Sequence, residues 1–292
     1  MKVGLQVYTV RNHLKADPAK TLEEVAKAGY KGIEFANHVA EKDIGIGFGY
    51  TKEEMQKIVK DTGIDVIGAH VTSSDALKTD IYTDLEYFKK IIDYYVALDA
   101  KFLSIPQDCY ATKDILLRRC QDFDALGKLC KENGITLLYH NHWNEYQQFD
   151  GENIIDLLMG NTDPNYLKIE LDTYWTAIGL INPVDMIHQY KDRVALLHQK
   201  DFPLEKIDKF NAWNRIDRDK IVTLEQFHSL IDPELFTEIG NGVLKIQDYI
   251  DAGNEYGVPY ILVEQDYSKY DEFESINISM NNFKKMRGLE WD

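Results

Sequence analysis

Eight short apolar runs, separated by segments of helical periodicity, constrain the fold more than any other feature of this sequence. The runs are rich in Val, Ile, Leu and Phe, and they lie at residues 3–8, 32–35, 66–70, 102–106, 136–140, 167–172, 194–200 and 260–264. Helical spacing of apolar residues occurs at 22–28, 52–61, 84–98, 115–133, 154–159, 184–190 and 246–256, and again after the last run at 275–286. This alternation is typical of repeated βα units.

Four junctions between a helical segment and the next apolar run carry a glycine at the same place. These glycines are Gly29, Gly63, Gly134 and Gly257. Glycine adopts the left-handed conformation after the last helical turn without a clash of Cβ, so it suits the position just past a helix end. The repeated stop signal supports the division of the chain into βα units.

Strands that are apolar nearly throughout must be covered on both faces, and eight of them with intervening helices predict a closed (β/α)₈ barrel, the TIM barrel. An open doubly wound sheet is the rival, but no G-x-G-x-x-G follows the first run. No linker interrupts the series, so we expect residues 1–292 to form a single TIM-barrel domain. Residues 201–245 are too long for a simple βα connection and predict an extended loop region over the barrel mouth.

Composition excludes several classes of protein. The chain has 33 Lys and Arg against 49 Asp and Glu, a net charge of −16, and its basic residues are scattered. Such a chain repels the phosphate backbone, so we expect no nucleic acid partner. The three cysteines lie outside any CxxC or metal-finger spacing, which is typical of reduced cytosolic thiols.

The first residues and the apolar runs both argue against export or membrane insertion. The N-terminal segment lacks the basic head, apolar stretch and cleavage site of a secretory signal. The longest uncharged apolar runs are strand-sized, far below the roughly 20 residues of a membrane helix. We therefore predict a cytoplasmic protein without a membrane partner.

Polar residues gather at the ends of the predicted strands, where barrel enzymes hold their chemistry. Four of the eight histidines of the chain are among them. In chain order the residues are Gln6, Tyr8, Glu34, His70, Gln107, His140, His142, Asp172, His198, Lys200, Glu264 and Gln265. Chance clustering is a poor explanation for this pattern.

Asp172 and Glu264 end the sixth and eighth runs, and His198 lies two residues before the end of the seventh. Carboxylates and an imidazole that meet at an apolar barrel mouth are costly to desolvate unless they bind a cation or one another. We therefore predict one divalent metal ion, Mn²⁺ first, with Mg²⁺, Co²⁺, Fe²⁺ or Zn²⁺ as alternatives. For any one of the three residues alone, a hydrogen-bonded polar side chain at a solvated rim is an equal explanation.

A fourth ligand is expected from the segment after the fifth run, where two assignments stay open. Strand alternation sends His140 and His142 to the same side, and Glu145 can fold back over the mouth. We favour Glu145 because an oxygen-rich set suits Mn²⁺ or Mg²⁺, which leaves His140 or His142 free to move protons. One of the two histidines alternatively only orients a neighbour.

The remaining strand-end residues are candidates for substrate contacts and catalysis. Lys200 has the charge to hold a carboxylate, phosphate or enediolate oxygen, or it pairs with Asp201. Trp175 can stack on a sugar face or serve as packing. Five other side chains can form hydrogen bonds to sugar hydroxyls, or alternatively to backbone groups at the barrel mouth. They are Gln6, Tyr8, Glu34, His70 and Gln107.

Six segments, taken together and in order, resemble the xylose isomerase-like barrels, in the branch of sugar phosphate isomerases/epimerases related to inosose dehydratase. They span the chain from the first run to the last. The segments are Leu5-Gln6-Val7-Tyr8-Thr9-Val10-Arg11, Tyr139-His140-Asn141-His142 with Glu145, Leu171-Asp172-Thr173-Tyr174-Trp175, His198-Gln199-Lys200-Asp201, Glu238-Ile239-Gly240-Asn241-Gly242 and Val263-Glu264-Gln265-Asp266.

The resemblance implies a divalent metal held by a Glu, Asp, His and Glu set, three of which transfer to Asp172, His198 and Glu264. At the fifth strand many relatives have a glutamate where this chain has His140, so the fourth ligand passes to Glu145. The same departure sets aside the two-glutamate proton shuttle of the ketose epimerases. It brings the chain closer to members that remove a proton beside a carbonyl and then eliminate, such as inosose dehydratases and lyases of 3-keto-glycosides.

The expected reaction is metal-assisted isomerisation or epimerisation of a small carbohydrate, with His142, His140, Glu264 and Lys200 as catalytic groups and a lyase or dehydratase as the close alternative. The acidic pair Glu264 and Asp266 follows the eighth run, where a barrel phosphate site would lie, and predicts an unphosphorylated sugar, keto-sugar or cyclitol. A metal-dependent endonuclease and a non-catalytic sugar-binding barrel are the weaker alternatives. Assembly into a homo-oligomer stays open.

Overall fold

Eight parallel strands close into a barrel in the computed structural model, which describes residues 1–36, 49–71, 81–217 and 220–291. The strands are β1 (Lys2–Gln6), β2 (Gly32–Ala36), β3 (Asp65–His70), β4 (Phe102–Ile105), β5 (Thr136–His140), β8 (Leu167–Asp172), β9 (Val194–Gln199) and β10 (Tyr260–Val263). They are hydrogen-bonded in the order β1-β10-β9-β8-β5-β4-β3-β2, and every neighbouring pair is parallel. The predicted closed (β/α)₈ barrel is confirmed.

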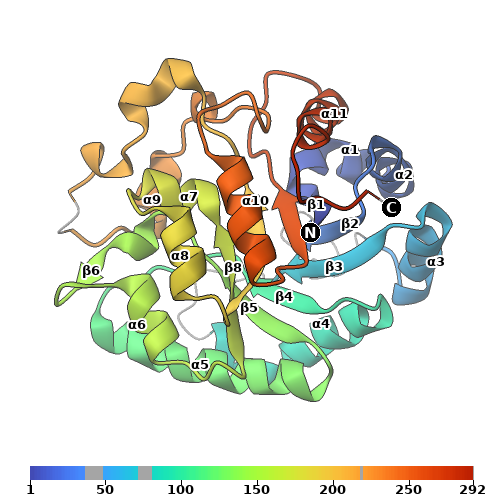
Figure 1. The fold of residues 1–292 in the computed structure, drawn as a ribbon. Coiled ribbons are helices and arrows are strands. Elements are labelled where there is room, and N and C mark those ends of the chain that lie inside the picture. The colour runs from blue at the N-terminus through green and yellow to red at the C-terminus, as the bar shows by residue number, and fades with distance from the viewer. Residues whose placement is uncertain (37–48, 72–80, 218–219, 292) are drawn as a thin grey trace.

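Helices surround this barrel, as Figure 1 shows. They are α1 (Arg11–Ala16), α2 (Pro18–Ala28), α3 (Lys52–Thr62), α4 (Leu85–Ala97), α5 (Lys113–Glu132), α6 (Ile154–Gly160), α7 (Thr173–Ile178), α8 (Pro183–Gln189), α9 (Leu224–Ser229), α10 (Ile246–Glu255) and α11 (Glu272–Phe283). A small antiparallel hairpin of β6 (Gln148–Phe149) and β7 (Glu152–Asn153) follows β5. The short helices α1 and α7 were not predicted, because each starts directly after a strand end or a 3₁₀ turn and has only six residues.

Helix ends follow the capping rules that the sequence suggested. Gly29, Gly63, Gly134 and Gly257 all have positive φ, at 109°, 67°, 79° and 69°. Helix α3 also begins with a capping box, in which Thr51 accepts from the N–H of Glu54 while the Glu54 carboxylate accepts from the N–H of Thr51. The four predicted glycine positions at helix ends are therefore confirmed, and each marks where a helix ends before the next strand.

Alternation along the strands places an apolar layer beneath a polar one inside the barrel. The apolar layer is a cluster separate from the main core, formed by Ile67, Leu138, Ala195, Leu196 and Leu262. Leu138 and Leu196 stand two residues before His140 and His198, so each pair shares one face of its strand. The apolar layer is therefore the floor on which the polar strand ends lie.

The long connection after β9 is fixed to the strand by Asp201. One carboxylate oxygen of Asp201 accepts from the N–H groups of Phe202 and Leu244, at 2.9 and 3.1 Å. The other accepts from Gly240 and Gly242, at 2.9 and 3.0 Å. A Cβ on Gly242 would lie 2.3 Å from the Asp201 Oδ1 atom, so only glycine allows this approach. The glycines of this turn thus shape a loop around an internal carboxylate.

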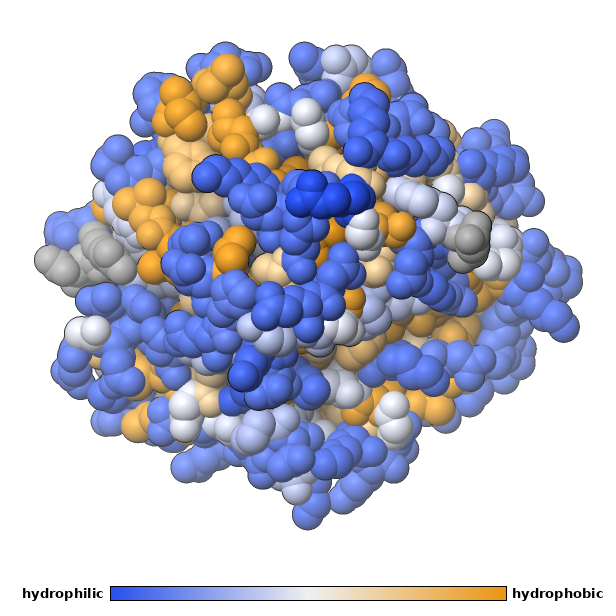
Figure 2. All heavy atoms as spheres, viewed as in Figure 1, coloured by the Kyte–Doolittle hydropathy of each residue, from blue (hydrophilic) through white to orange (hydrophobic). Residues whose placement is uncertain are grey.

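Hydrophilic side chains cover most of the face seen in Figure 2, and apolar surface gathers at its upper left, over the light-orange segment of Figure 1. Leu204 and Ile207, on a 3₁₀ helix of that segment (η5, Leu204–Lys209), are exposed.

Every helix in the described residues is too short or too polar to cross a membrane.

Removing the Asp201 carboxylate should destabilise the fold through the loop that it holds. Hydrogen bonds to a charged group contribute about 1.5–3 kcal/mol each. We expect Asp201→Ala to lower the free energy of unfolding by about 3 kcal/mol or more, and Asp201→Asn by a smaller amount because the amide keeps one acceptor oxygen. Urea denaturation measures both changes. Asp208→Ala, at an exposed position of the same connection, is the control and should change stability by about 0.5 kcal/mol at most; equal midpoints for Asp201→Ala and wild type would contradict the anchor.

Two thiols should be protected by the fold. Burial raises the pKa of Cys120 and Cys130 to about 12 from an ordinary value of 9.0. Alkylation requires the thiolate, so iodoacetamide at pH 8 should modify both cysteines roughly 1,000-fold more slowly in the folded protein than in urea. Between pH 9.0 and about 12, these thiols lose their protons in the unfolded chain but keep them in the folded protein. The free energy of unfolding should therefore fall as the pH rises through that range. Mass spectrometry of labelled peptides measures the rates, and equal labelling in both states would refute the protection.

Candidate metal and active site

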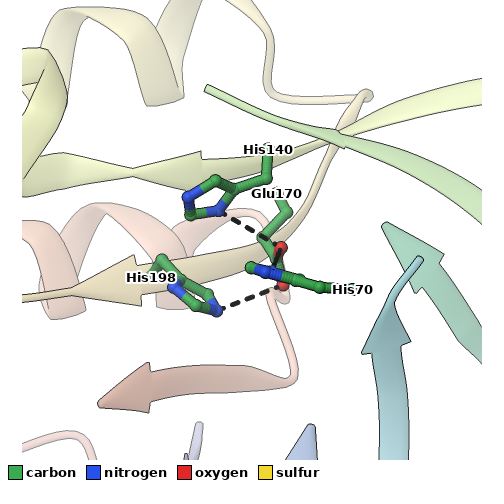
Figure 3. Close-up of side chains that lie close together, drawn as sticks. All are labelled: His70, His140, Glu170 and His198. Atoms are coloured by element: carbon green, nitrogen blue, oxygen red, sulfur yellow. Dashed lines mark hydrogen bonds and ion pairs between the residues drawn. The ribbon is translucent and has the colours of Figure 1, made fainter. Parts of the chain in front are cut away.

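Two carboxylates and two imidazoles meet in the polar layer, just above the apolar floor. His198 Nε2 lies 2.9 Å from Glu34 Oε2 and 3.5 Å from Glu170 Oε1. His70 Nε2 lies 2.8 Å from Glu170 Oε2 and 3.1 Å from Glu34 Oε2. All four side chains are buried and come from β2, β3, β8 and β9. We call Glu34, His70, Glu170 and His198 the inner cluster; Figure 3 shows three of its members together with His140.

A second group lies at the strand ends, around the ammonium of Lys200. Lys200 Nζ donates to Asp172 Oδ2 at 2.8 Å and also to Glu264 Oε2. His140 Nε2 lies 3.9 Å from Asp172 Oδ2, and His198 Nδ1 lies 3.4 Å from Glu264 Oε2. We call His140, Asp172, His198 and Glu264 the outer cluster. Lys200 bonds with the two carboxylates of this cluster, not with the neighbouring Asp201.

His140 and His198 each present their two ring nitrogens to different clusters. His140 Nδ1 lies 3.3 Å from Glu170 Oε2, while its Nε2 faces Asp172. His198 has the opposite orientation, with Nε2 toward the inner carboxylates and Nδ1 toward Glu264. The rings are close, with centroids 4.7 Å apart. These two histidines therefore connect the inner and outer layers.

The buried charges shift one another strongly. Burial alone would raise the pKa of Glu34, but His70 and His198 lower it below its usual range. Burial would also lower the pKa of His198, yet Glu170, Glu264 and Glu34 raise it to about 10. The pKa of His140 is instead lowered well below 6.5, by burial above all, and then by neighbouring histidines. The His140 imidazole is thus neutral, whereas the side chains around it are charged.

The donor sets of both clusters fit a divalent cation. In the described residues, the four outer-cluster residues His140, Asp172, His198 and Glu264 each bring one donor atom to within 4.8 Å of one another. Three inner-cluster residues, His70, Glu170 and His198, do the same together with His140, while Glu34 Oε2 lies 3.1 Å from His70 Nε2 and 2.9 Å from His198 Nε2. Nδ1 of His140, Nδ1 of His198 and Glu170 Oε1 are buried without a hydrogen-bond partner in the described part of the chain. Neutral imidazole nitrogen and carboxylate oxygen are common ligands of Mn²⁺, Fe²⁺, Co²⁺ and Zn²⁺. A buried cluster that can bind a metal is therefore present.

Glu145, the predicted fourth ligand, lies apart from these groups. It is on a 3₁₀ helix after β5 (η4, Asn144–Tyr146), where Oε1 accepts from the Tyr139 hydroxyl at 2.7 Å and Oε2 from the N–H of His142 at 2.8 Å. Burial raises the pKa of Glu145 to about 7, although both hydrogen bonds lower it. His140 takes the place beside the other three outer ligands, and Glu145 stays a prediction.

Three buried side-chain nitrogens near the barrel mouth have no hydrogen-bond partner among the residues that the structure describes: Gln107 Nε2, His142 Nδ1 and Trp175 Nε1. The Trp175 ring lies 5.5 Å from Lys200 Nζ and 5.2 Å from the His142 ring, which places Trp175 and His142 at the outer cluster. Trp175 is held there because Asp172 caps α7, accepting from the N–H of Trp175 at 2.8 Å. Unpaired polar atoms beside a cationic site are suited to hydroxyl recognition.

The other predicted substrate contacts bond within the protein. Gln6 Nε2 donates to Glu34 Oε2 at 2.8 Å, and its Oε1 accepts from the N–H of Tyr8 at 3.1 Å. The Arg11 guanidinium lies 4.1 Å from the centre of the half-buried Tyr8 ring. Glu34 and His70 belong to the inner cluster. Their role in binding a substrate stays a prediction.

Glu170 is the site residue that the sequence reasoning missed. It stands two residues before Asp172 on β8, so both side chains share one face of the strand. A rule that examined every second residue back from each strand end would have found it. A charged residue inside an apolar run is itself an uncommon signal.

Comparison with known proteins agrees with the barrel fold. The sequence model of a family described as xylose isomerase-like TIM barrel matches residues 22–285. Inosose dehydratase of Lacticaseibacillus casei is 25% identical over 278 residues, 87% of this chain and 85% of that protein. Inosose dehydratase of Mesomycoplasma hyopneumoniae strain 7448 is 26% identical over 93% of this chain and 89% of its own length. A solved sugar phosphate isomerase/epimerase of Parabacteroides distasonis has a TM-score of 0.79 and 25% identity, covering 99% of this chain and 95% of that one.

Replacing Lys200 should expose the repulsion between the carboxylates that it joins. Loss of one partner in a buried ion pair typically costs about 3–5 kcal/mol. We expect Lys200→Met to lower the free energy of unfolding by that amount in protein treated with chelator. Added Mn²⁺ should restore more stability to this variant than to wild type, since the ion and the ammonium compete for the same oxygens.

Lys206→Met is the matched control for this measurement. Lys206 pairs with the exposed Glu234, and a surface pair contributes about 1 kcal/mol at most. Urea denaturation of wild type and both variants, with and without Mn²⁺, gives all six values. Equal stability of Lys200→Met and wild type in chelator would refute the proposed role of the ammonium.

Proposed function

Because the chain belongs to the xylose isomerase-like TIM barrel family, we propose that it removes a proton next to a carbonyl group of a sugar, keto-sugar or cyclitol. Isomerisation or epimerisation is the first net reaction that we propose, and elimination is the second. The observation that carries this proposal is the meeting of an unpaired imidazole, a buried ammonium and a metal-binding cluster at one end of the barrel. Together these groups provide a base, a proton donor and a site for a Lewis acid.

The residues around the outer cluster divide into a base and an acid. His142 Nδ1 has no hydrogen-bond partner within the described residues, so this atom is free to accept the proton from carbon. Lys200 Nζ carries protons beside Asp172 and Glu264, so it can donate to the oxygen on which negative charge develops. General acid and base groups of this kind contribute about 10²–10⁴-fold each. His140 and Glu264, at the same cluster, would position these groups or move the proton onward.

A divalent ion would be held by His140, Asp172, His198 and Glu264, with Glu145 as the alternative to His140. We propose Mn²⁺ first, and Mg²⁺, Co²⁺, Fe²⁺ or Zn²⁺ as substitutes. When bound, such an ion supplies a Lewis acid that polarises a carbonyl and stabilises an enediolate. The Lys200 ammonium would then leave the two carboxylates and turn toward the substrate.

An uncharged carbohydrate suits the surroundings of this cluster. Trp175 offers an aromatic face for a sugar ring, and its indole N–H and the Gln107 amide are unpaired donors within the described structure. The loop that would hold a phosphate binds the Asp201 carboxylate instead, and the carboxylates of Glu264 and Asp266 repel anions. We therefore propose an unphosphorylated substrate, and no nucleic acid.

Elimination is the second candidate because one observation favours it. The two curated relatives described above are inosose dehydratases, and each is matched over more than four fifths of its length. Loss of a hydroxyl group after proton removal needs an acid for the leaving oxygen, and Lys200 is positioned to act as that acid. The two candidates share their first step and differ in the fate of the enediolate.

Incubation with inososes and keto-sugars in D₂O, with each divalent metal in turn, tests the proposal. Deuterium exchange at the carbon next to the carbonyl without loss of water or aglycone would indicate isomerisation or epimerisation. Loss of either would indicate a lyase. NMR and mass spectrometry follow both outcomes, and the absence of exchange with any metal and any of these substrates would refute the shared first step.

Substitution of the proposed base gives a sharper expectation. His142→Gln should lower kcat by about 10²–10⁴-fold and leave the bound metal in place. His188→Gln is the matched control, because His188 is an exposed histidine that contacts Tyr256 on the outside of the barrel. It should retain wild-type kcat. Equal activity of both variants would remove His142 from the mechanism.

A further inference from the structure

We propose that the inner cluster is a second divalent cation site, one layer deeper in the barrel than the ion of the proposed function. Its ligands are Glu34, His70, Glu170 and His198. The set holds two imidazole nitrogens and two carboxylates, a combination that favours Zn²⁺ or Co²⁺ in tetrahedral geometry. It shares His198 with the outer cluster.

The spacing of the donor atoms matches a tetrahedral site. Zinc lies about 2.0–2.1 Å from nitrogen and oxygen ligands, so the ligand atoms of a regular tetrahedron are roughly 3.3 Å apart. In the inner cluster, Glu34 Oε2 lies 3.1 Å from His70 Nε2 and 2.9 Å from His198 Nε2. Glu170 lies 2.8 Å from His70 Nε2 through Oε2 and 3.5 Å from His198 Nε2 through Oε1, so both of its oxygens face the same space. An ion can therefore enter by small side-chain movements.

Burial and unpaired atoms point to a ligand. Glu34, Glu170 and His198 are each 0% exposed, and His70 is 4% exposed. Glu170 Oε1 has no hydrogen bond in the described structure, although buried polar atoms are nearly always paired. In Figure 3, the Glu170 carboxylate lies between His70, His140 and His198. A buried carboxylate oxygen that lies 3.5 Å from His198 Nε2 and has no hydrogen bond in the described structure is placed where a cation would bind it.

Surrounding side chains hold the ligands in place. Gln6 Nε2 donates to Glu34 Oε2 at 2.8 Å, and Ser104 Oγ donates to Glu34 Oε1 at 3.4 Å. Polar contacts of this kind orient metal ligands and keep their lone pairs directed at the ion. They give Gln6 and Glu34 a structural reason to be at the barrel mouth that does not require contact with a substrate.

The two ring nitrogens of the shared histidines allow both layers to be filled at once. With both layers filled, His198 would give Nε2 to the inner ion and Nδ1 to the outer one as an imidazolate, with its ring protons released to solvent. His140 would give Nε2 to the outer ion beside Asp172. Each ion then has its own pair of carboxylates, Glu34 and Glu170 inside, Asp172 and Glu264 outside. A divalent charge offsets each buried pair. The alternative is an inner cluster in which protons, and no metal ion, balance the charge of the two carboxylates.

Metal content measures the difference. The full chain is stripped with chelator, loaded separately with Zn²⁺ or Co²⁺, desalted and analysed by mass spectrometry of the elements. We expect two equivalents in wild type and one in both Glu170→Gln and His70→Gln. Glu264→Gln, the matched substitution in the outer cluster, should retain the inner equivalent. The visible spectrum of this Co²⁺-loaded variant should show the intense bands of tetrahedral coordination, and Glu170→Gln should lose them.

Every other outcome of this experiment either supports or overturns the inner site. One equivalent that Glu264→Gln removes and Glu170→Gln retains overturns the inner site and supports the outer one alone. One equivalent with the reverse pattern supports the inner site and removes the metal from the proposed function. A single equivalent that all three variants lose indicates one shared site, and two equivalents in Glu170→Gln place the second ion elsewhere; both overturn the proposal. Circular dichroism of each stripped variant verifies folding, and His70→Gln replaces Glu170→Gln if that variant is unfolded.

Discussion

Four carboxylates, those of Glu34, Glu170, Asp172 and Glu264, are buried together inside the barrel, and their charge must be offset where water cannot reach. The chain meets this demand with Lys200 and with imidazoles that carry protons or can yield them to a metal. Each partner is tied to at least one of these acids at hydrogen-bond distance. Strand positions, ring orientations and the capping of α7 all serve this balance. The site is therefore a set of coupled charges in which no member can be changed without affecting the others.

The layered interior explains how an apolar barrel tolerates that much charge. Strand alternation places Leu138 and Leu196 in the apolar layer and His140 and His198 in the polar layer next to it. The polar groups therefore meet at the carboxyl ends of the strands, against an apolar layer. Low polarity beneath the site strengthens each electrostatic interaction above it. The buried carboxylates therefore depend on nearby positive charge for their stability.

Sequence patterns predicted the barrel nearly in full, because eight apolar runs and four glycine stops are local signals with strong physical causes. The same patterns located Asp172, His198 and Glu264 at one mouth, since parallel strands bring their ends together. They could not assign Glu145, whose side chain lies in a turn where the local backbone decides its direction, and there it bonds to Tyr139. Neither could they find Glu170, which depends on tracing alternation inward from the strand end, nor foresee that Gln6 supports Glu34.

Asp201 closes the turn at Gly240 and Gly242 with a carboxylate from the chain itself. Backbone N–H groups gathered in this way form a concave anion receptor, and here the receptor is filled from within. An external anion could occupy this receptor only by displacing the Asp201 carboxylate, and the long connection would then lose the hydrogen bonds that hold it to β9. Anion binding in this turn and the stability of the connection are thereby linked at one residue.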